Sequence, residues 1–394
     1  MNFWKLSEEE LKAKGAFNTA KEIYQQPKAW QETLDLLEAN KEQIESFINP
    51  LLAKENVRII FTGAGTSAYV GDIVAPYLRE KTNKDVWAIA TTDIVSAPHQ
   101  YLLKDVPTVL ISFARSGDSP ESIGAFDLAE QLVDEIYQVV ITCNKNGKLA
   151  KRAEDKNDHT LVFFTPEETN DLGFAMTSSF SSMLLSALLI FDRKDYLENI
   201  ELAKNVINLG EKVLADAKGL ADIDITSFER IVFLGSGSLY GLSRETCLKV
   251  LELTAGKIAA VSEGVMGFRH GPKSIINDKT LVVIWLSSDS YTRQYEMDFL
   301  EELYHDVGDF KVMAVSAYKD ESVAKLADYT FFVDENETSV WGKDAYIALD
   351  YVLFDHLLAV KASMGKDVAP DTPCPSGSVN RVVKGVTLHE LKEN

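Results

Sequence analysis

The sequence contains one pattern of apolar strand, glycine turn and helix start twice. The segment "RIIFTGAGTSAYVG" at 58–71 is repeated as "RIVFLGSGSLYG" at 230–241. A second pair, "VLISFARSGDS" at 109–119 and "VVIWLSSDS" at 282–290, aligns at nearly the same offset, with Ser116 on Ser287. Two unrelated motif pairs at one spacing indicate two copies of one folding unit.

Within each copy, apolar runs rich in β-branched residues alternate with helical patterns. In the first copy we expect strands at 57–62, 86–91, 108–113, 137–142 and 160–164, and helices near 67–80, 120–134 and 178–191. In the second copy we expect strands at 230–234, 258–261, 280–286, 311–316 and 329–333, and helices near 243–255 and 345–363. This alternation predicts an α/β fold of two tandem domains, each a parallel sheet flanked by helices on both faces.

The repeat also suggests where the domains begin and end. We expect an N-terminal helical extension over 1–44, a first domain over 45–197 and a second domain over 215–364. The acidic stretch between the two domains reads as a helical linker. The last segment, 365–394, is interrupted by prolines and is expected to be a tail that closes the site.

Composition excludes several classes of partner. The formal net charge of −20 argues against nucleic acid, whose phosphate backbone needs a basic surface. A small anion is not excluded, because its binding depends on nearby groups and not on the net charge of the protein. The three cysteines have no CxxC spacing, the start shows no secretory leader, and the longest apolar stretch is too short to span a bilayer. We therefore expect a cytoplasmic protein without a membrane partner.

A loop crowded with serines, "SFARSGDSPES" at 112–122, follows a buried strand. Ser119 before Pro120 has the order of a helix N-cap and first helical residue. Ligands of parallel sheets bind beyond the carboxyl ends of the strands, and a helix start offers free N–H groups to an anion. With Thr66 and Ser67 at the other helix start, and Arg115 as a cation, this loop predicts a phosphate site. The alternative is that the serines only cap helices and fill turns.

A dinucleotide site is the main rival, because Gly63, Gly65 and Ala68 fit the G-x-G-x-x-A fingerprint. That fingerprint wants an acidic residue about 20 residues on, at the end of the next strand. Asp85 precedes its strand and Asp93 lies too far along. We expect no nucleotide cofactor and no other cofactor. A metal is not expected either, because the histidines show no ligand spacing.

The duplicated strand–GxGTS–helix unit with its serine-rich loop resembles the sugar isomerase (SIS) family. The segment "CLKVLELTAGKIAAVSEGVMGFRHGPKS" (247–274) is similar to the isomerase half of glucosamine-6-phosphate synthase, as is the tail "NRVVKGVTLH" (380–389). The segments "VMGFRHGPKS" and "ETNDLGFAMTSSF" (168–180) most resemble bacterial tagatose-6-phosphate ketose/aldose isomerases, a group also described as galactosamine-6-phosphate deaminases.

The resemblance implies roles for particular residues. It places the phosphate on Ser67, Arg115, Ser116 and Ser119, with Thr177 as a further sugar contact. One departure is that Ala114 replaces a serine of the synthase pattern and Arg115 replaces a glutamine, so the phosphate geometry is expected to differ. The second loop, Ser287–Ser288–Asp289, carries an acid where a phosphate would sit, and we expect it to hold no phosphate.

The resemblance also implies the catalytic groups. Glu252 is the expected base for proton transfer between C1 and C2, with Glu263 as the second candidate, and an ordinary helix glutamate is the alternative. His270 is expected to open the sugar ring. Lys384 would close the site, contact the sugar or form a Schiff base, unless it is a plain surface lysine. Because the matching histidine of the synthase comes from the neighbouring subunit, a homodimer or higher homo-oligomer with shared sites is implied.

Two reactions fit this set of residues. We favour the conversion of galactosamine 6-phosphate to tagatose 6-phosphate and ammonia over plain ketose/aldose isomerisation of tagatose 6-phosphate. A protein of another class, a non-catalytic sugar-phosphate sensor, stays as the third possibility. The expected partner in every case is a phosphorylated sugar or amino sugar.

Overall fold

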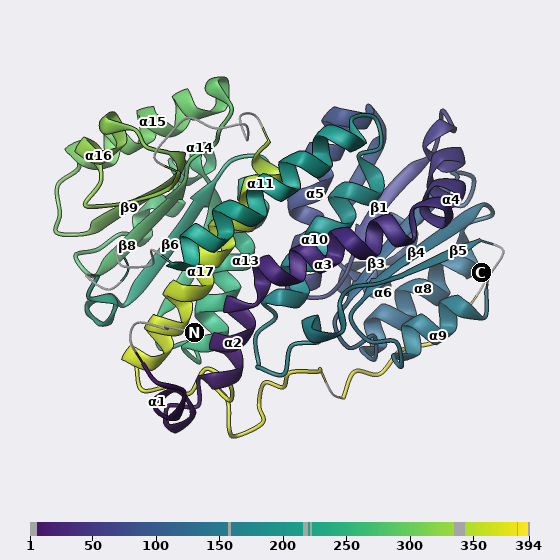
Figure 1. Ribbon diagram of the computed structural model, residues 1–394, viewed down its shortest axis with the longest axis horizontal. Coiled ribbons are helices and arrows are strands. Elements are labelled where there is room, and N and C mark those ends of the chain that lie inside the picture. The colour runs from purple at the N-terminus through teal and green to yellow at the C-terminus, as the bar shows by residue number, and fades with distance from the viewer. Residues whose placement is uncertain are drawn as a thin grey trace. The chain divides into compact units, whose positions relative to one another are not determined.

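The structure is a computed structural model that describes residues 6–156, 159–215, 220, 223–334, 343–383 and 385–392. Its contacts divide the chain into two compact units, each built on one sheet (Figure 1). The first-sheet unit comprises Ala29–Asp171, Ser178–Ile200 and Ser376–Asn394. The second-sheet unit comprises Met1–Lys28, Leu172–Thr177 and Glu201–Pro375. The domain boundaries expected from the repeat stay predictions.

The first sheet has five parallel strands in the described residues, in the order β2-β1-β3-β4-β5. Their bounds are β1 (Arg58–Thr62), β2 (Asp85–Ala88), β3 (Thr108–Ala114), β4 (Ile136–Thr142) and β5 (Thr160–Phe164). Every residue of β1 and β3 is buried, as expected for central strands of a parallel sheet. All five strands agree with the sequence prediction within about three residues, the scatter expected at element ends.

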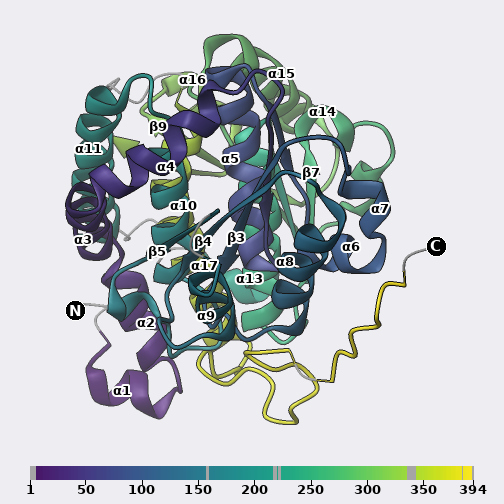
Figure 2. The same ribbon diagram turned by 90° about the vertical axis from the view of Figure 1, so that its right-hand side faces the viewer.

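Helices cover both faces of this sheet. The helices of its unit are α4 (Lys41–Ala53), α5 (Thr66–Thr82), α6 (Thr91–Ser96), α7 (Pro98–Tyr101), α8 (Pro120–Leu132), α9 (Lys148–Glu154) and α10 (Ser178–Phe191), with most of α3 (Gln26–Ala39). Helix α11 (Tyr196–Ala215) begins in this unit and belongs to the second-sheet unit from Glu201 on. Successive strand residues point to opposite faces, so Ile60 packs in the α6/α8 core while Phe61 meets Phe191 of α10 at 5.3 Å between ring centroids. Helices α6 and α8 lie next to each other on the first of these faces (Figure 2).

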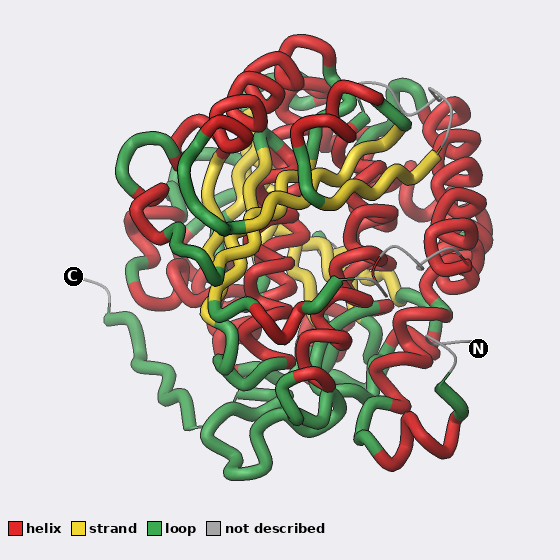
Figure 3. The backbone as a smooth tube through the Cα atoms, turned by 90° about the vertical axis from the view of Figure 1, so that its left-hand side faces the viewer, coloured by secondary structure: helices red, strands yellow, loops and turns green. Residues whose placement is uncertain are grey.

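The second sheet repeats the topology of the first. Its order, β10-β9-β8-β6-β7, is the order of the first sheet with each strand replaced by its copy. The strands are β6 (Arg230–Gly235), β7 (Ala259–Gly264), β8 (Thr280–Trp285), β9 (Lys311–Tyr318) and β10 (Tyr329–Asp334). The α/β class with two tandem parallel sheets is therefore confirmed, and Figure 3 shows both sheets in yellow.

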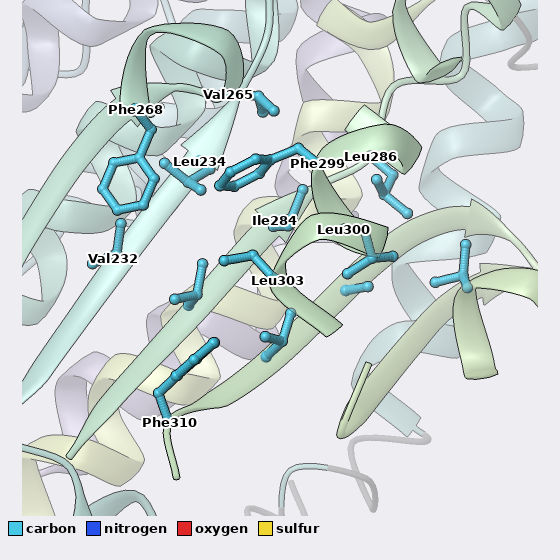
Figure 4. Packing of buried hydrophobic residues seen from close by; sticks show 14 residues of the cluster. Val232, Leu234, Val265, Phe268, Ile284, Leu286, Phe299, Leu300, Leu303 and Phe310 are labelled. Atoms are coloured by element: carbon cyan, nitrogen blue, oxygen red, sulfur yellow. The ribbon is translucent and has the colours of Figure 1, made fainter. Parts of the chain in front are cut away.

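The second sheet is also covered on both faces. The helices of its unit are α1 (Glu8–Ala13), α2 (Phe17–Tyr24), α13 (Ser238–Leu253), α14 (Val265–Phe268), α15 (Ser290–His305), α16 (Glu321–Leu326) and α17 (Asp344–Gly365), with short 3-10 turns η2 (Ile225–Ser227) and η3 (Pro272–Ile275). On one face, Val232 and Ile284 pack against Phe268 of α14 and Phe299 of α15 (Figure 4). On the other face, Trp285 stacks on Tyr351 of α17 at 5.7 Å between ring centroids.

Three further features bear on the sequence predictions. The described residues of 367–392 form no helix or strand, as expected for a tail. None of the described helices is long and apolar enough to cross a membrane. Cys143, Cys247 and Cys374 are free thiols. Localisation in the cytoplasm stays a prediction.

Candidate functional site

Two loops of the first sheet end at the same edge. Strands β1 and β3 are neighbours in register, with Thr62 opposite Ser112, so the loops that follow them lie together. After β1, Gly65 adopts φ 56° and ψ −128° and α5 begins at Thr66. A Cβ on Gly63 would lie 2.5 Å from the backbone of Ser67, so only glycine permits this close turn. The structure thus places Thr66 and Ser67 beside the serine-rich loop that precedes α8.

The start of α8 leaves its first N–H groups open. Ser119 is the N-cap residue, yet its hydroxyl makes no capping hydrogen bond in the described structure and pairs with the Ser122 hydroxyl at 2.7 Å. Thr66 is buried and its Oγ1 has no hydrogen-bond partner among the described residues. Because a buried donor without a partner is costly, the Thr66 hydroxyl fits an anion that accepts from it, and the uncapped N–H groups at the start of α8 can donate to the same anion. The Ser116 hydroxyl accepts a hydrogen bond from Asp118 N at 3.3 Å.

Arg115 is buried at the end of β3 and contacts the tail. Its Nη2 donates a hydrogen bond to the carbonyl oxygen of Arg381 at 2.9 Å, and the Arg381 guanidinium donates to the carbonyl oxygen of Asp171. The Asp171 carboxylate in turn accepts from the Ser179 backbone and hydroxyl at the start of α10. Sequence reasoning assigned Arg115 to the phosphate and missed this link, because residues so far apart in the chain give no local signal. Its role toward phosphate stays a prediction.

Thr177, which the sequence predicts as a further sugar contact, is buried directly before α10. Nearby, the backbone N–H groups of Leu172 and Gly173 donate to the Glu22 carboxylate. This segment is therefore fixed by a buried carboxylate, which gives Thr177 a defined position.

Glu252, the expected base, lies in the last turn of α13 with its side chain 24% exposed. The ammonium of Lys249 lies 2.5 Å from its Oε2. Lys249 is fully buried and lies 3.6 Å from Oε1 of Glu245, one turn earlier. The helix thus presents a half-buried carboxylate held by a buried cation. Sequence reasoning missed Lys249 and Glu245, although their i+3 and i+4 spacing to Glu252 and to each other was a readable signal.

The second candidate base, Glu263, has a less distinctive environment. It lies on β7 and its Oε1 accepts a hydrogen bond from the backbone of Gly264 at 2.9 Å. A carboxylate that bonds to its own chain is a common local turn contact. The choice between Glu252 and Glu263 as the base stays a prediction.

His270 is exposed in the turn between α14 and η3. Ion pairs on both sides hold this turn to the C-terminal end of α15 and to Asp306, which follows it. They run from Arg269 to Glu302 at 2.5 Å and from Lys273 to Glu302 and Asp306 at 2.6 Å each. The histidine is thus presented to solvent by a braced loop. Lys384 lies outside the described residues. No group of three or more potential metal ligands occurs in the part of the chain that the structure describes.

Comparison with known proteins identifies the family. Residues 51–193 match the family model of the SIS domain. The chain is 43% identical over 391 residues to "D-galactosamine-6-phosphate deaminase AgaS" of Shewanella sp., covering 98% of this chain and 95% of the relative. The crystal structure of tagatose-6-phosphate ketose/aldose isomerase from Escherichia coli matches with a TM-score of 0.86 and 40% identity, over 95% of this chain and 97% of that one. A Clostridium novyi protein described as a candidate isomerase of the same name matches with a TM-score of 0.93 and 47% identity, over 98% of both chains. The resemblance found in the sequence is confirmed, and the chain belongs to the SIS family, in the group that contains the AgaS galactosamine-6-phosphate deaminases.

Proposed function

We propose that this protein is a sugar-phosphate deaminase that converts galactosamine 6-phosphate and water to tagatose 6-phosphate and ammonia. The observation that carries this proposal is the 43% identity to the Shewanella AgaS deaminase over almost the whole of both chains. The open start of α8 and the Glu252–Lys249 pair support it, because they supply the two functions that the reaction needs, phosphate binding and proton transfer.

The phosphate binds at the start of α8. Its oxygens accept from the free N–H groups of the first turn and from the hydroxyls of Ser116, Ser119 and Thr66, with Ser67 close by. The positive end of the helix dipole favours the dianion without a large cationic patch. A protein with a net charge of −20 can therefore hold an anionic substrate.

Glu252 moves the proton. It takes the proton from C2 of the open-chain amino sugar, which gives an enaminol, and a proton returned to C1 converts this to an imine at C2. Water adds to the imine carbon, the C–N bond breaks, and ammonia and the C2 ketone leave. Lys249 keeps the Glu252 carboxylate in place through the 2.5 Å contact.

His270 and Lys384 complete the proposed set. His270 shuttles a proton between the anomeric hydroxyl and the ring oxygen, which opens the ring before proton transfer. Lys384 closes over the sugar. The family resemblance further implies that His270 serves a neighbouring subunit's substrate, so we propose a homodimer. Mixing Glu252→Gln and His270→Ala subunits, each inactive alone, restores part of the activity if sites are shared, and restores none if each chain works by itself.

Ketose/aldose isomerisation of tagatose 6-phosphate is the second candidate. The specific support is the name of the Escherichia coli relative, with 40% identity. The same Glu252 chemistry serves both reactions, because isomerisation differs only in having a hydroxyl on C2. A non-catalytic sugar-phosphate sensor is the third possibility and predicts binding without turnover.

One assay separates the three. The purified protein is incubated with galactosamine 6-phosphate, glucosamine 6-phosphate and tagatose 6-phosphate, and ammonia and ketose are quantified together. Deamination predicts equal amounts of ammonia and ketose from the galacto sugar. Turnover of tagatose 6-phosphate without ammonia from either amino sugar would replace deamination by isomerisation. Binding with no product from any sugar would leave the sensor.

A further inference from the structure

The second sheet repeats the two loops that form the candidate phosphate site of the first. Gly237, before α13, has φ 55° and ψ −126°, almost the values of Gly65. The loop after β8, "LSSDS" at 286–290, precedes α15 as the serine-rich loop precedes α8. Strands β6 and β8 are neighbours in register, so their loops lie together as in the first sheet. The second unit thus has the backbone of an anion site.

In this second copy, a carboxylate of the protein occupies the donors of the loop. Asp344, the first residue of α17, accepts hydrogen bonds from the Ser287 hydroxyl at 2.5 Å, the Ser288 backbone at 2.8 Å and the Ser288 hydroxyl at 2.7 Å. Ser287 and Ser288 are completely buried. Three buried donors converging on one carboxylate is the arrangement with which proteins bind a phosphate or sulfate.

A second carboxyl group joins the two loops. Oε2 of Glu296 accepts a hydrogen bond from the Ser287 backbone at 2.6 Å. The Glu296 side chain also hydrogen-bonds to the side chain of Ser236 in the loop before α13. The side chain is fully buried, and its Oε1 has no hydrogen-bond partner among the described residues. Ser236 and Ser287 stand on the two loops that in the first copy flank the open site. Glu296 therefore fills the space between them.

The starts of α15 and α8 also differ, because a side chain of the protein caps α15. Asp289 caps α15 by accepting from the backbone of Tyr291 at 3.1 Å and of Thr292 at 2.9 Å. The corresponding Asp118 instead accepts from the backbone of Lys148 at 3.1 Å, outside α8. Side chains thus close the start of α15 and leave the start of α8 open.

We propose that the second repeat contains an anion site that the protein occupies with its own Asp344 carboxylate, so that removing this carboxylate opens the site to phosphate or a phosphate monoester. The buried donors of Ser287 and Ser288 require an acceptor, and Asp344 supplies it from within the chain. The same bonds tie the start of α17 to the end of β8. The loop after β8 then offers no free site to an external phosphate in the wild-type chain.

This site is distinct from the proposed catalytic carboxylate. Helix α13 runs from the glycine loop back along the sheet, so its last turn lies at the opposite end of the strands. At about 1.5 Å per residue, Glu252 lies roughly 20 Å along the helix from Ser238. The inference accordingly does not rest on the proposed reaction.

The test uses Asp344→Ala in a chain that also carries Ser116→Ala and Ser119→Ala, so that the first loop does not contribute. Binding of inorganic phosphate is measured by calorimetry, and the thermal midpoint is followed as phosphate is added. We expect the triple variant to bind one phosphate per chain at least 10-fold more tightly than the Ser116→Ala/Ser119→Ala parent, with a midpoint that rises with phosphate. A folded triple variant that binds phosphate no better than its parent would overturn the proposal.

Wild-type stoichiometry tests the same point without the risk of misfolding. Calorimetry with tagatose 6-phosphate should give one bound ligand per chain, and two would show that the second site is already open. A phosphate affinity of Asp344→Asn equal to that of Asp344→Ala would also contradict the proposal, because the carboxamide still fills the position. If no ammonia forms in the deaminase assay but the Asp344 variants bind phosphate as expected, only the proposed function is rejected.

Discussion

Arg115 and Arg381 are joined by a hydrogen bond of 2.9 Å from the Arg115 guanidinium to the Arg381 carbonyl oxygen. Further along the tail, Leu388 packs where it would meet a Cβ on Gly124 of α8, and the Gln131 side chain donates to the Leu391 carbonyl oxygen at 3.1 Å. The tail is thus fixed to the unit that carries the candidate phosphate loop, on both sides of Lys384 along the chain. We therefore expect Arg115 to position this segment.

Arg115→Ala should weaken binding through the tail. A hydrogen bond from a charged group contributes about 1.5–3 kcal/mol, so we expect roughly a 10-fold or greater loss of affinity for tagatose 6-phosphate in the full chain. In a chain that ends at Pro375, Arg115→Ala should reduce the affinity for tagatose 6-phosphate much less, because Arg381, the partner of Arg115, is absent. Calorimetry on the four proteins completes the cycle. Equal losses in both backgrounds would assign Arg115 to the phosphate alone.

Ser116→Ala combined with Ser119→Ala should raise KM about 10-fold or more, at about 1 kcal/mol for each lost hydrogen bond. The turnover number should change less, because the phosphate is remote from the reacting carbons. Ser46→Ala, at an exposed helix position, is the matched control. An unchanged KM would place the phosphate elsewhere.

Glu252→Gln should lower kcat by about 10²- to 10⁴-fold, the usual contribution of a general base, with substrate binding retained. Proton NMR in heavy water measures the step directly, because exchange of the C2 proton should stop. Glu301→Gln, exposed on α15, controls for loss of charge. C2 exchange that continues in Glu252→Gln and stops in Glu263→Gln would transfer the role to Glu263.

Stability should depend on the protonation of Glu296. Burial raises the pKa of Glu296 from its ordinary value of 4.5 to about 8; the nearby Asp344 acts in the same direction, while the Ser287 N–H, the Ser236 hydroxyl and Arg293 oppose it. The folded protein therefore keeps this proton between pH 4.5 and 8 while the unfolded chain has lost it. The contribution to stability is full below pH 4.5 and is lost as the pH rises through 8.

Glu296→Gln cannot ionise, so the wild type should lose stability relative to this variant as the pH rises from about 5 to about 9. The difference in the free energy of unfolding should change by up to roughly 1.4 kcal/mol per pH unit, and the thermal midpoint of the variant should rise relative to that of the wild type. Thermal unfolding at a series of pH values measures this difference, with Glu301→Gln as the control. Parallel curves for wild type and Glu296→Gln would show that the carboxyl group is already ionised.

Most of the fold could be predicted from the sequence because the same pattern of strands and loops occurs twice in the chain. Apolar strands ending in glycine or serine loops are local patterns, and the paired copies fixed their order. The start of α13 was placed too late, near 243 instead of Ser238, because the ends of elements are the least well defined part of a sequence pattern. The contact between Arg115 and Arg381, and the capture of Ser287 and Ser288 by Asp344, join distant segments and leave no periodic signal. Lys249 was missed for another reason: a charged residue on a helix usually faces water, and here it is fully buried.

The most direct test of the account is a crystal structure with tagatose 6-phosphate bound. The account predicts phosphate oxygens about 3 Å from the hydroxyls of Ser116 and Ser119 and from the first N–H groups of α8, with the Ser287–Ser288 loop still bonded to Asp344. A ligand bound elsewhere, with the start of α8 unoccupied, would contradict it.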